Sequence, residues 1–308
     1  MQRYISRRLI QMIIALFLMS VIVFLLGRLT GDPVSMLLSQ YSTEEDRVRI
    51  TEQLGLNKPV LEQYGIFLFN ALKGDLGKSV AGDNRPALAL ILERFPASLK
   101  LALVALIIST LIGIPLGVLS AVRRGSFLDA LARLIALLGQ SLPAFWLGIV
   151  LMYFFSVKLR LLPTSGYGGV RHFILPAATM GLFTVAAVTR LSRSSMLEVL
   201  DSEYIKLARI KGVSEAIVIW KHALRNSLIP VITFMGSFFA TMITGAVVIE
   251  TVFSWPGIGR LAYESILNRD FPVMQAVILF MTSLYILANL IVDILYAWVD
   301  PRIRYTNE

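Results

Sequence analysis

The chain contains no cysteine, few histidines and few charged residues. Without cysteine it can form no disulfide framework, no thiolate metal site and no cysteine nucleophile. Its two histidines, His172 and His222, lie in separate polar stretches outside any HExxH motif, so we expect no metal site. Charged residues make up 16% of the 308 residues and hydrophobic residues 56%. This balance excludes an ordinary soluble domain and is typical of a polytopic membrane protein.

Six apolar stretches approach or exceed the roughly 20 residues that a helix needs to cross a bilayer. They cover residues 9–27, 99–122, 134–157, 173–189, 229–249 and 272–299. The fourth is short and rich in Ala, Gly and Thr, so we expect other helices to surround it. The first is not a cleaved signal peptide, because its apolar core is too long and no small-residue cleavage site precedes Asp32.

The distribution of positive charge predicts that both termini are cytoplasmic. In that orientation the inner segments carry fifteen Lys and Arg, and the two short outer loops carry five. Basic cytoplasmic loops beside anionic lipid also account for the net charge of +9, so we expect no nucleic-acid partner. Residues 1–30 then form an inner end and the first span, 31–98 an extracytoplasmic segment, and 99–308 a five-helix core.

The extracytoplasmic segment contains helix-like pieces separated by turns. A helix is expected to open at Thr43-Glu44-Glu45, and residues 60–72 form an amphipathic stretch. The sequence from Gly74 to Ser79 is similar to a phosphate-binding loop, but GxxxxGK[ST] requires a glycine where Leu72 stands. We therefore expect no nucleotide and no other cofactor on this chain, and we interpret the segment as a docking surface or lid.

Ionisable residues are missing from the middles of the first five spans, and the last contains Asn289 and Asp293. Asp293 fits a proton site or a structural hydrogen bond to a neighbouring helix, and the absence of relay partners favours the second. The sequence shows no paired catalytic residues at membrane depth, which disfavours an intramembrane enzyme.

The polar stretch 190–228 holds seven Lys and Arg against four Asp and Glu. Asp201 and Ser202 can cap a helix over residues 203–211, and Gly212 suits the left-handed position that ends such a helix. Ser214 can cap the next helix, in which Ile217, Trp220 and Leu224 share one face. The stretch fits either a cytoplasmic loop that meets a soluble partner or an amphipathic segment lying on the membrane.

Short motifs over nearly the whole length resemble one family, the B-type membrane permeases of dipeptide, oligopeptide and nickel ABC importers. The motifs are Arg28-Leu-Thr-Gly-Asp-Pro33, Leu54-Gly-Leu56 with Pro59, Gly74-Asp-Leu-Gly77, Leu142-Pro143 with Phe145-Trp146, Leu162-Pro163, Ile174-Leu-Pro176, Arg193-Ser-Ser-Met196, Ala208-Arg-Ile-Lys-Gly212, His222-Ala-Leu-Arg-Asn226, Trp255-Pro-Gly257, Arg269-Asp-Phe-Pro272 and Asp300-Pro301. The resemblance implies an all-α inner-membrane protein of six spans that is not itself an enzyme. It also implies a homologous second permease, two cytoplasmic ATP-binding subunits and an extracytoplasmic solute-binding protein as partners.

In such permeases the cytoplasmic loop couples transport to the ATPase through the signature EAA, three residues, then glycine. Gly212 and Ala208 match this signature, whereas Lys206 and Leu207 stand at its first two positions. The resemblance implies a coupling helix that acts as a lever, and an outer gate or docking site for the binding protein. The coupling residues would be Glu203, Tyr204, Ala208, Arg209, Lys211, Gly212 and Ser214, and the outer residues Trp255, Pro256, Gly257 and Gly259.

The alternative function is a gated channel for small solutes or ions without ATP coupling, which predicts polar rings that the spans mostly lack. The cargo stays open among dipeptides, oligopeptides, glutathione-like peptides, and nickel or its chelates.

The topology can be tested by cysteine labelling, since the chain has no native cysteine. We expect single cysteines at Asp83 or Gly168 to react with an impermeant reagent in intact cells. Cysteines at Ser126 or Ser214 should react only after the membrane is opened. Labelling of Ser214→Cys from outside would contradict the cytoplasmic assignment of the 190–228 stretch.

Overall fold

The structure of the chain, a computed structural model, describes residues 2–29, 43–53, 57–81 and 84–299. These residues are almost entirely helical and contain no β-strand, only an isolated bridge between Lys78 and Pro86. This confirms the all-α prediction. The motif residues Thr30 to Pro33, Leu54 to Leu56 and Asp300-Pro301 lie outside the described residues.

Five helices are long and apolar enough to cross a membrane, and one bent pair of helices makes a possible sixth span. The chain forms two compact units, residues 1–97 with 256–308 and residues 98–255.

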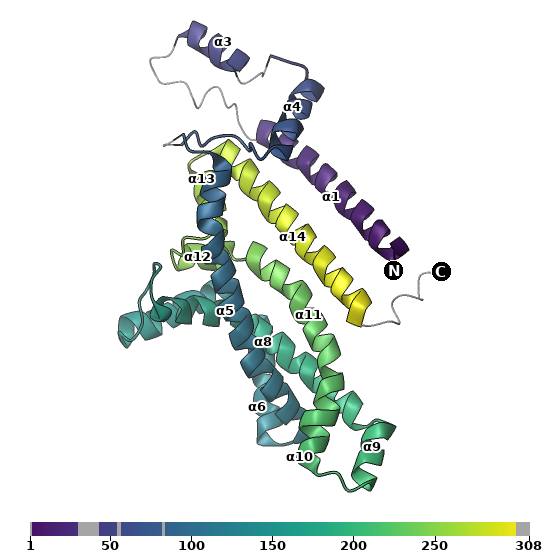
Figure 1. The fold of residues 1–308 in the computed structure, drawn as a ribbon. Helices are drawn as coiled ribbons and strands as arrows, with labels where there is room; N and C mark the ends of the chain where they lie inside the picture. Colours follow the sequence, from purple (N-terminus) through teal and green to yellow (C-terminus); the bar gives the residue numbers. More distant parts are fainter. Residues whose placement is uncertain (1, 30–42, 54–56, 82–83, 300–308) are drawn as a thin grey trace. The chain divides into compact units, whose positions relative to one another are not determined.

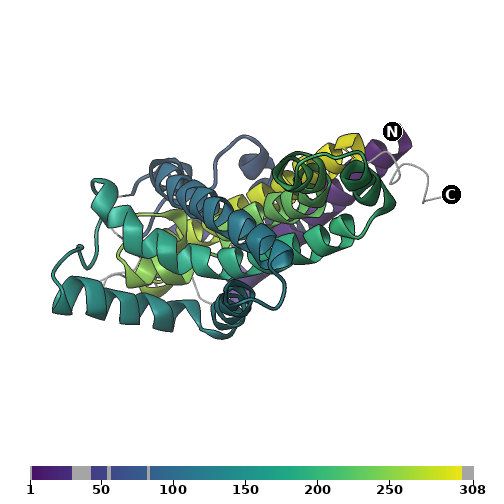
Figure 2. The ribbon, with the colours of Figure 1, turned by 90° about the horizontal axis from the view of Figure 1, so that it is seen from below.

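The first unit is built on two long apolar helices. Its elements are α1 (Gln2–Leu29), α3 (Glu44–Gln53), α4 (Val60–Leu72), the first turns of α5 (Ala87–Val122), α13 (Ile258–Leu267) and α14 (Phe271–Val299). Helix α1 runs along α14 in both views (Figures 1 and 2), and α13 packs against α14. A core of Ile91, Ile258, Val273 and Val277 joins α5, α13 and α14. The predicted outer helix 60–72 is α4.

A buried carboxylate fixes the turn that resembles a phosphate-binding loop. Asp270 is 4% exposed and accepts hydrogen bonds from the Ser79 hydroxyl and the Val80 and Val273 amides. Gly77 in this turn has a φ of +86°, a left-handed conformation that glycine adopts without strain. The turn is therefore a structural joint between the segment that follows α4 and the start of α14.

Asp293 forms an ion pair between helices. Its Oδ2 lies 3.3 Å from Arg8 Nη1 of α1. This contact agrees with the structural interpretation of Asp293 rather than with a proton site.

The second unit is organised around α8 (Val170–Leu200). The other elements are the rest of α5, α6 (Phe127–Ser141), α7 (Ala144–Leu151), η1 (Met152–Lys158), α9 (Glu203–Ile210), α10 (Glu215–Ile217), η2 (Val218–Ala223), α11 (Leu224–Thr244) and α12 (Val247–Val252). Helix α8 packs against α6 and α11 (Figure 1). Within its most apolar window 67% of the residues are buried, against 39% for α5 and 28% for the span that includes α11. The expectation that other helices surround the fourth span is confirmed.

Glycines let α8 approach its neighbours closely. A Cβ atom at Gly117 of α5 would lie 2.6 Å from both the Ser192 Cβ and the Thr189 carbonyl oxygen of α8. A Cβ atom at Gly139 of α6 would lie 2.7 Å from that of Ala186. Small residues at such crossings allow helix backbones to pack tightly within membranes.

The predicted third span, residues 134–157, is not one straight rod. Helix α6 ends at Ser141, and the following helix, α7 with η1, is bent from it by 109°. Leu142 has the extended dihedrals φ −84° and ψ 128°, as expected of a residue before a proline, here Pro143. The predicted span is therefore broken at the Leu142-Pro143 pair, and the two helices together make the possible sixth span.

The predicted fifth span, residues 229–249, also ends early. Helix α11 stops at Thr244, and α12 begins as a separate short helix at Val247 after Gly245. Helix α12 packs against α7. Hydropathy alone did not reveal this break because the residues on both sides of it are apolar.

We expect Gly117→Ala to destabilise the folded chain by about 1–3 kcal/mol, since the new methyl group would overlap backbone atoms of α8. The control is Gly65→Ala in α4, where nothing lies within 4 Å of the added Cβ. Denaturant unfolding of the purified chain measures both. Equal stability of the two variants would contradict the close packing of α5 on α8.

Candidate functional site

The polar stretch 190–228 is mostly helical in the structure. Its beginning belongs to α8, which continues to Leu200, and its end belongs to α10, η2 and α11. Between them, α9 and its two flanking turns form the end of the second unit (Figure 1). The exposed connection is therefore shorter than the sequence suggested, because the polar residues at both ends extend the neighbouring helices.

One residue anchors α9 to the membrane helices. Ile205 is fully buried in a core with Val118 and Ala121 of α5, Met196 of α8 and Val218 of η2. Burial of such an aliphatic side chain contributes roughly 1.5–3 kcal/mol. Any displacement of α9 must therefore disturb the ends of these helices.

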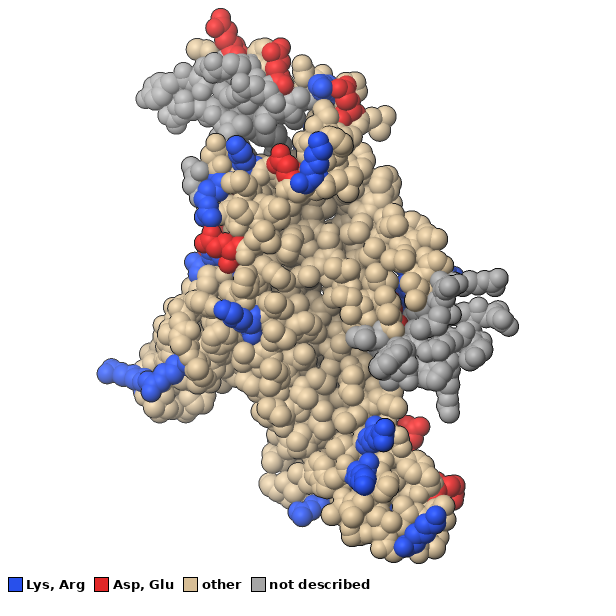
Figure 3. All heavy atoms as spheres, in the orientation of Figure 1, with Lys and Arg blue, Asp and Glu red and all other residues tan. Residues whose placement is uncertain are grey.

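The opposite face of α9 exposes apolar side chains beside the charged Glu203. Leu207 is 51% exposed and Ile210 is 81% exposed. Tyr204 is also exposed, and its hydroxyl oxygen accepts a 2.7 Å hydrogen bond from the Asn226 amide. Figure 3 shows blue and red side chains at the end of the molecule that carries α9, whereas the long helices above it are mostly tan on this face. Apolar side chains set among charged ones are typical of protein contact surfaces.

Charged pairs lie along α9 and at its link to α10. Lys206 Nζ lies 2.8 Å from Glu203 Oε1, and this hydrogen bond raises the pKa of Lys206. Arg209 makes a two-pronged contact of 2.7 and 3.1 Å with the carboxylate of Glu215. Both pairs are exposed, so their main effect is on geometry rather than on stability.

Gly212 ends α9 as predicted. Its φ is +76°, a conformation in which a side chain is strained, although no atom lies within 4 Å of an added Cβ. The Gly212 and Val213 amides donate to the carbonyls of Arg209 and Ala208. Lys211 occupies the C-cap position before it.

Ser202 and Ser214 occupy the predicted N-cap positions, but their side chains make no capping hydrogen bond. The Ser202 hydroxyl donates instead to the carbonyl of Val199. The positions of the two helix starts were predicted correctly, and the side-chain bonds were not.

The apolar residues that follow Ser214 divide into an exposed and a buried set. Ile217 and Trp220 are about half exposed, whereas Val218, Ile219 and Ala223 are buried. The three buried residues belong to the π-helical stretch η2.

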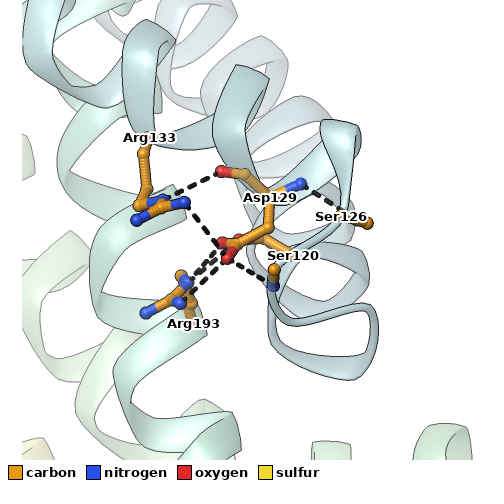
Figure 4. A network of polar contacts seen from close by, with 6 residues as sticks. Ser120, Ser126, Asp129, Arg133 and Arg193 are labelled. Atoms are coloured by element: carbon orange, nitrogen blue, oxygen red, sulfur yellow. Dashed lines mark hydrogen bonds and ion pairs between the residues drawn. The ribbon is translucent and has the colours of Figure 1, made fainter.

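A buried ion-pair network joins the helices that lead to α9 (Figure 4). Asp129 of α6 is 1% exposed and accepts hydrogen bonds from the Ser120 hydroxyl and the Gly125 amide. Its carboxylate also receives two hydrogen bonds from Arg193 of α8, from Nε at 2.8 Å and from Nη2 at 3.3 Å. Arg133 lies farther away, with 3.6 Å between Nη2 and Oδ2. We call Ser120, Gly125, Asp129 and Arg193 the Asp129 clamp.

The Asp129 clamp was missed by the sequence analysis. It fixes the end of α5 and the start of α6 to the last third of α8, the helix that continues into α9. A local signal did exist, because Ser126-x-x-Asp129 has the spacing of a helix-capping pair, and the Ser126 hydroxyl does accept from the Asp129 amide. The partner Arg193 is far away in sequence and had no such signal.

The predicted outer site residues are mostly buried. In the second unit the Trp255 side chain is fully buried, with its ring 4.8 Å from that of Tyr167 and 4.6 Å from that of Phe173. In the first unit Gly257 and Gly259 are buried at the start of α13, and Pro256 before them is partly exposed. The Trp255 ring is thus the centre of an aromatic cluster, and the role of these residues as an outer gate or docking site stays a prediction.

A second buried carboxyl group in the second unit was also missed. Glu250 of α12 is fully buried and accepts a hydrogen bond from the buried Ser98 hydroxyl of α5. Its signal in the sequence was one acidic residue directly after an apolar run. Among the described residues, no three His, Asp or Glu side chains are grouped so that they could hold a metal ion.

Comparison with known proteins gives matches over the whole chain. The sequence profile described as "Binding-protein-dependent transport system inner membrane component" matches residues 113–305, and that of the corresponding N-terminal region matches residues 1–102. The glutathione transport system permease protein GsiC of Escherichia coli strain CFT073 is 42% identical over 306 residues, which are 99% of this chain and all of the relative. A probable peptide ABC transporter permease, y4tP of Sinorhizobium fredii, is 39% identical over 98% of this chain and 99% of the relative.

Solved structures show the same fold at lower identity. A chain of the MetNI methionine ABC transporter in an inward-facing conformation superposes with a TM-score of 0.57 at 19% identity, over 69% of this chain and 97% of that one. An amino acid ABC transporter chain gives a TM-score of 0.51 at 17% identity, over 66% and 91%.

We expect Asp129→Asn to cost about 3 kcal/mol of stability, because it leaves the partly buried Arg193 guanidinium without its counter-charge. The control is Glu62→Gln in the exposed Lys58–Glu62 pair, which should change stability by less than about 1 kcal/mol. Denaturant unfolding of the purified chain measures both variants. Adding Arg193→Gln to Asp129→Asn should recover part of the loss; an additive further loss would show that the two side chains do not interact.

Proposed function

The chain belongs to the family of binding-protein-dependent inner membrane transport components of ABC importers, and we propose that it carries short peptides. A glutathione-like tripeptide is the cargo we favour. The observation that carries this choice is 42% identity to a glutathione permease over essentially the full length of both chains, with a peptide permease at 39%. We favour peptides over nickel because both of these relatives are named for peptide-type cargo.

The proposed complex pairs this chain with a homologous second permease. Two cytoplasmic ATP-binding subunits would supply the energy, and an extracytoplasmic binding protein would deliver the cargo. In this complex the chain forms one half of a pathway that opens alternately to the two sides of the membrane.

We propose that α9 is the coupling helix. Its exposed apolar face, with Tyr204, Leu207 and Ile210, fits a cleft on an ATP-binding subunit. The buried Ile205 would transmit movement of that subunit to α5, α8 and η2. Glu203, Ala208, Arg209 and Lys211 complete the helix, and Gly212 and Ser214 set its exit toward α10.

The Asp129 clamp supports the proposed role of α9 as a lever. A helix transmits force only if its base is fixed, and the clamp bonds α8 to α5 and α6 shortly before α9 begins. Movement of α9 would therefore reach the membrane helices as a shift of packed elements rather than as bending of a loop.

On the outer side we place the docking surface on the first unit, outside the buried Trp255–Gly259 segment. Just after the end of α13, Asn268 and Arg269 are exposed, and Asn268 lines a cavity of about 450 Å³ together with Ser79, Glu264 and Asp270. This surface and the exposed parts of α3 and α4 would receive the binding protein.

Uptake by the reconstituted complex tests the cargo and the energy source. We expect proteoliposomes with both permeases, the ATP-binding subunits and the binding protein to take up glutathione only with ATP on the ATPase side. Uptake that continues without ATP would indicate a gated channel. ATP-driven uptake of nickel but not of peptides would overturn the proposed cargo while leaving the coupling mechanism in place.

Gly212→Val tests the lever. A β-branched residue at φ +76° is strained by roughly 1–2 kcal/mol, which is too little to prevent assembly but enough to redirect the end of α9. We expect near-normal complex yield and at least about a tenfold loss of uptake and of ATPase stimulation by the loaded binding protein.

Two controls accompany this variant. Gly212→Asn should retain most activity because asparagine tolerates the left-handed conformation. Ile249→Val in α12 should leave uptake and stimulation intact. Full uptake by the Gly212→Val complex would mean that this glycine is an ordinary turn residue.

A further inference from the structure

A groove between α6 and α8 gathers three arginines. It has a volume of about 390 Å³ and is lined by Arg133, Leu137 and Gln140 of α6 and by Thr189, Arg190 and Arg193 of α8. On α6 the three residues are three or four positions apart, and on α8 Arg193 lies four positions after Thr189 and three after Arg190, so the residues of each helix line the same side. The groove lies wholly within the second unit.

The positive charge in this groove exceeds the negative charge that contacts it. Among the described residues, Asp129 is the one carboxylate in contact with these guanidinium groups, and it is bonded mainly to Arg193. Arg190 bonds instead to the neutral Gln140 amide oxygen at 3.0 Å. One carboxylate against three guanidinium groups leaves the groove with a local charge of about +2, which favours an anion.

The floor of the groove offers a further polar group. Thr189 is 1% exposed, and within the described part of the chain its hydroxyl has no hydrogen-bond partner. Buried hydroxyl groups are normally paired, because an unpaired one costs free energy. A ligand or a water molecule held by the groove would provide that partner.

The surface beside the groove is apolar. Leu134, Leu137 and Leu138 of α6 are 50%, 64% and 46% exposed. Arg193 contacts Ser120, near the last residue of α5, so the arginines lie close to the level at which α5 ends. Guanidinium groups near the ends of spans, next to exposed leucines, match a lipid headgroup and its acyl chains better than a soluble anion.

We propose that this groove binds one anionic phospholipid, with its phosphate between Arg133, Arg190 and Arg193 and an acyl chain along the exposed leucines of α6. The bound lipid would hold α6 against α8 next to the Asp129 clamp. The site is independent of the cargo and of the coupling role of α9.

Native mass spectrometry of the purified full chain tests the site, with phosphatidylglycerol and phosphatidylcholine of the same acyl chains as probes. We expect selective retention of one phosphatidylglycerol. The double variant Arg133→Gln/Arg190→Gln should weaken it about 30-fold, at about fivefold for each basic residue removed. The matched control is Lys158→Gln/Arg160→Gln. It removes the same two positive charges at the end of η1, where neither residue lines the groove, and it should leave retention unchanged.

Several results would overturn the proposal. Equal retention of phosphatidylcholine would show an apolar groove only, and an equal loss in both double variants would show non-specific attraction. Displacement of phosphatidylglycerol by millimolar inorganic phosphate would indicate a site for a soluble anion. Release of the lipid on co-assembly with the second permease would assign the groove to the subunit interface.

A single variant keeps the test decisive if the double variant does not fold. The Arg190 side chain bonds only Gln140 among the described residues, so Arg190→Gln leaves the Asp129 clamp intact. We expect it to weaken phosphatidylglycerol retention about fivefold. Unchanged retention would contradict the site.

Discussion

The buried carboxylate of Asp129 is the contact on which the arrangement of the second unit depends. It takes hydrogen bonds from α5, from the turn before α6 and from α8, and a buried charge is tolerated only when it is satisfied in this way. Dispersion between apolar helices is not directional, so it would allow them to slide or rotate. A bidentate ion pair fixes one register of α6 on α8. The close approach of Gly139 of α6 to Ala186 of α8 belongs to that register.

Buried acids that bond groups from other segments occur in both units. Asp270 joins the turn at Ser79 to the start of α14, and Glu250 joins α12 to Ser98 of α5. Each of these acids bonds a hydroxyl group that is distant in sequence. Hydropathy analysis treats such acidic residues only as the ends of apolar runs. In the structure they determine where short helices are held. These are also the places where the chain departs from straight spans.

The proposed coupling mechanism follows from how α9 is held rather than from its composition alone. One face is fixed by Ile205, and the opposite face exposes Leu207 and Ile210 beside the charged Glu203. A helix fixed on one side and exposed on the other can receive a force and pass it on. The arginine-lined groove beside the Asp129 clamp would place an anionic lipid at the base of the same lever, so that the membrane itself would contribute to its rigidity.

Local sequence determined the all-helical class, most span positions, the helix α4 and the ends of α9, because hydropathy and backbone preferences act over a few neighbouring residues. It identified Gly212 correctly, since a left-handed helix end has a local signature. It did not reveal the pairing of Asp129 with Arg193, the bend at Leu142-Pro143 as a break between helices, or the burial of Trp255. These depend on which distant groups meet: an acid is tolerated inside only where an arginine from another helix reaches it, and an aromatic ring is buried only where other rings surround it. Tertiary structure alone decided those contacts, because their free energy comes from neighbours far away in the chain.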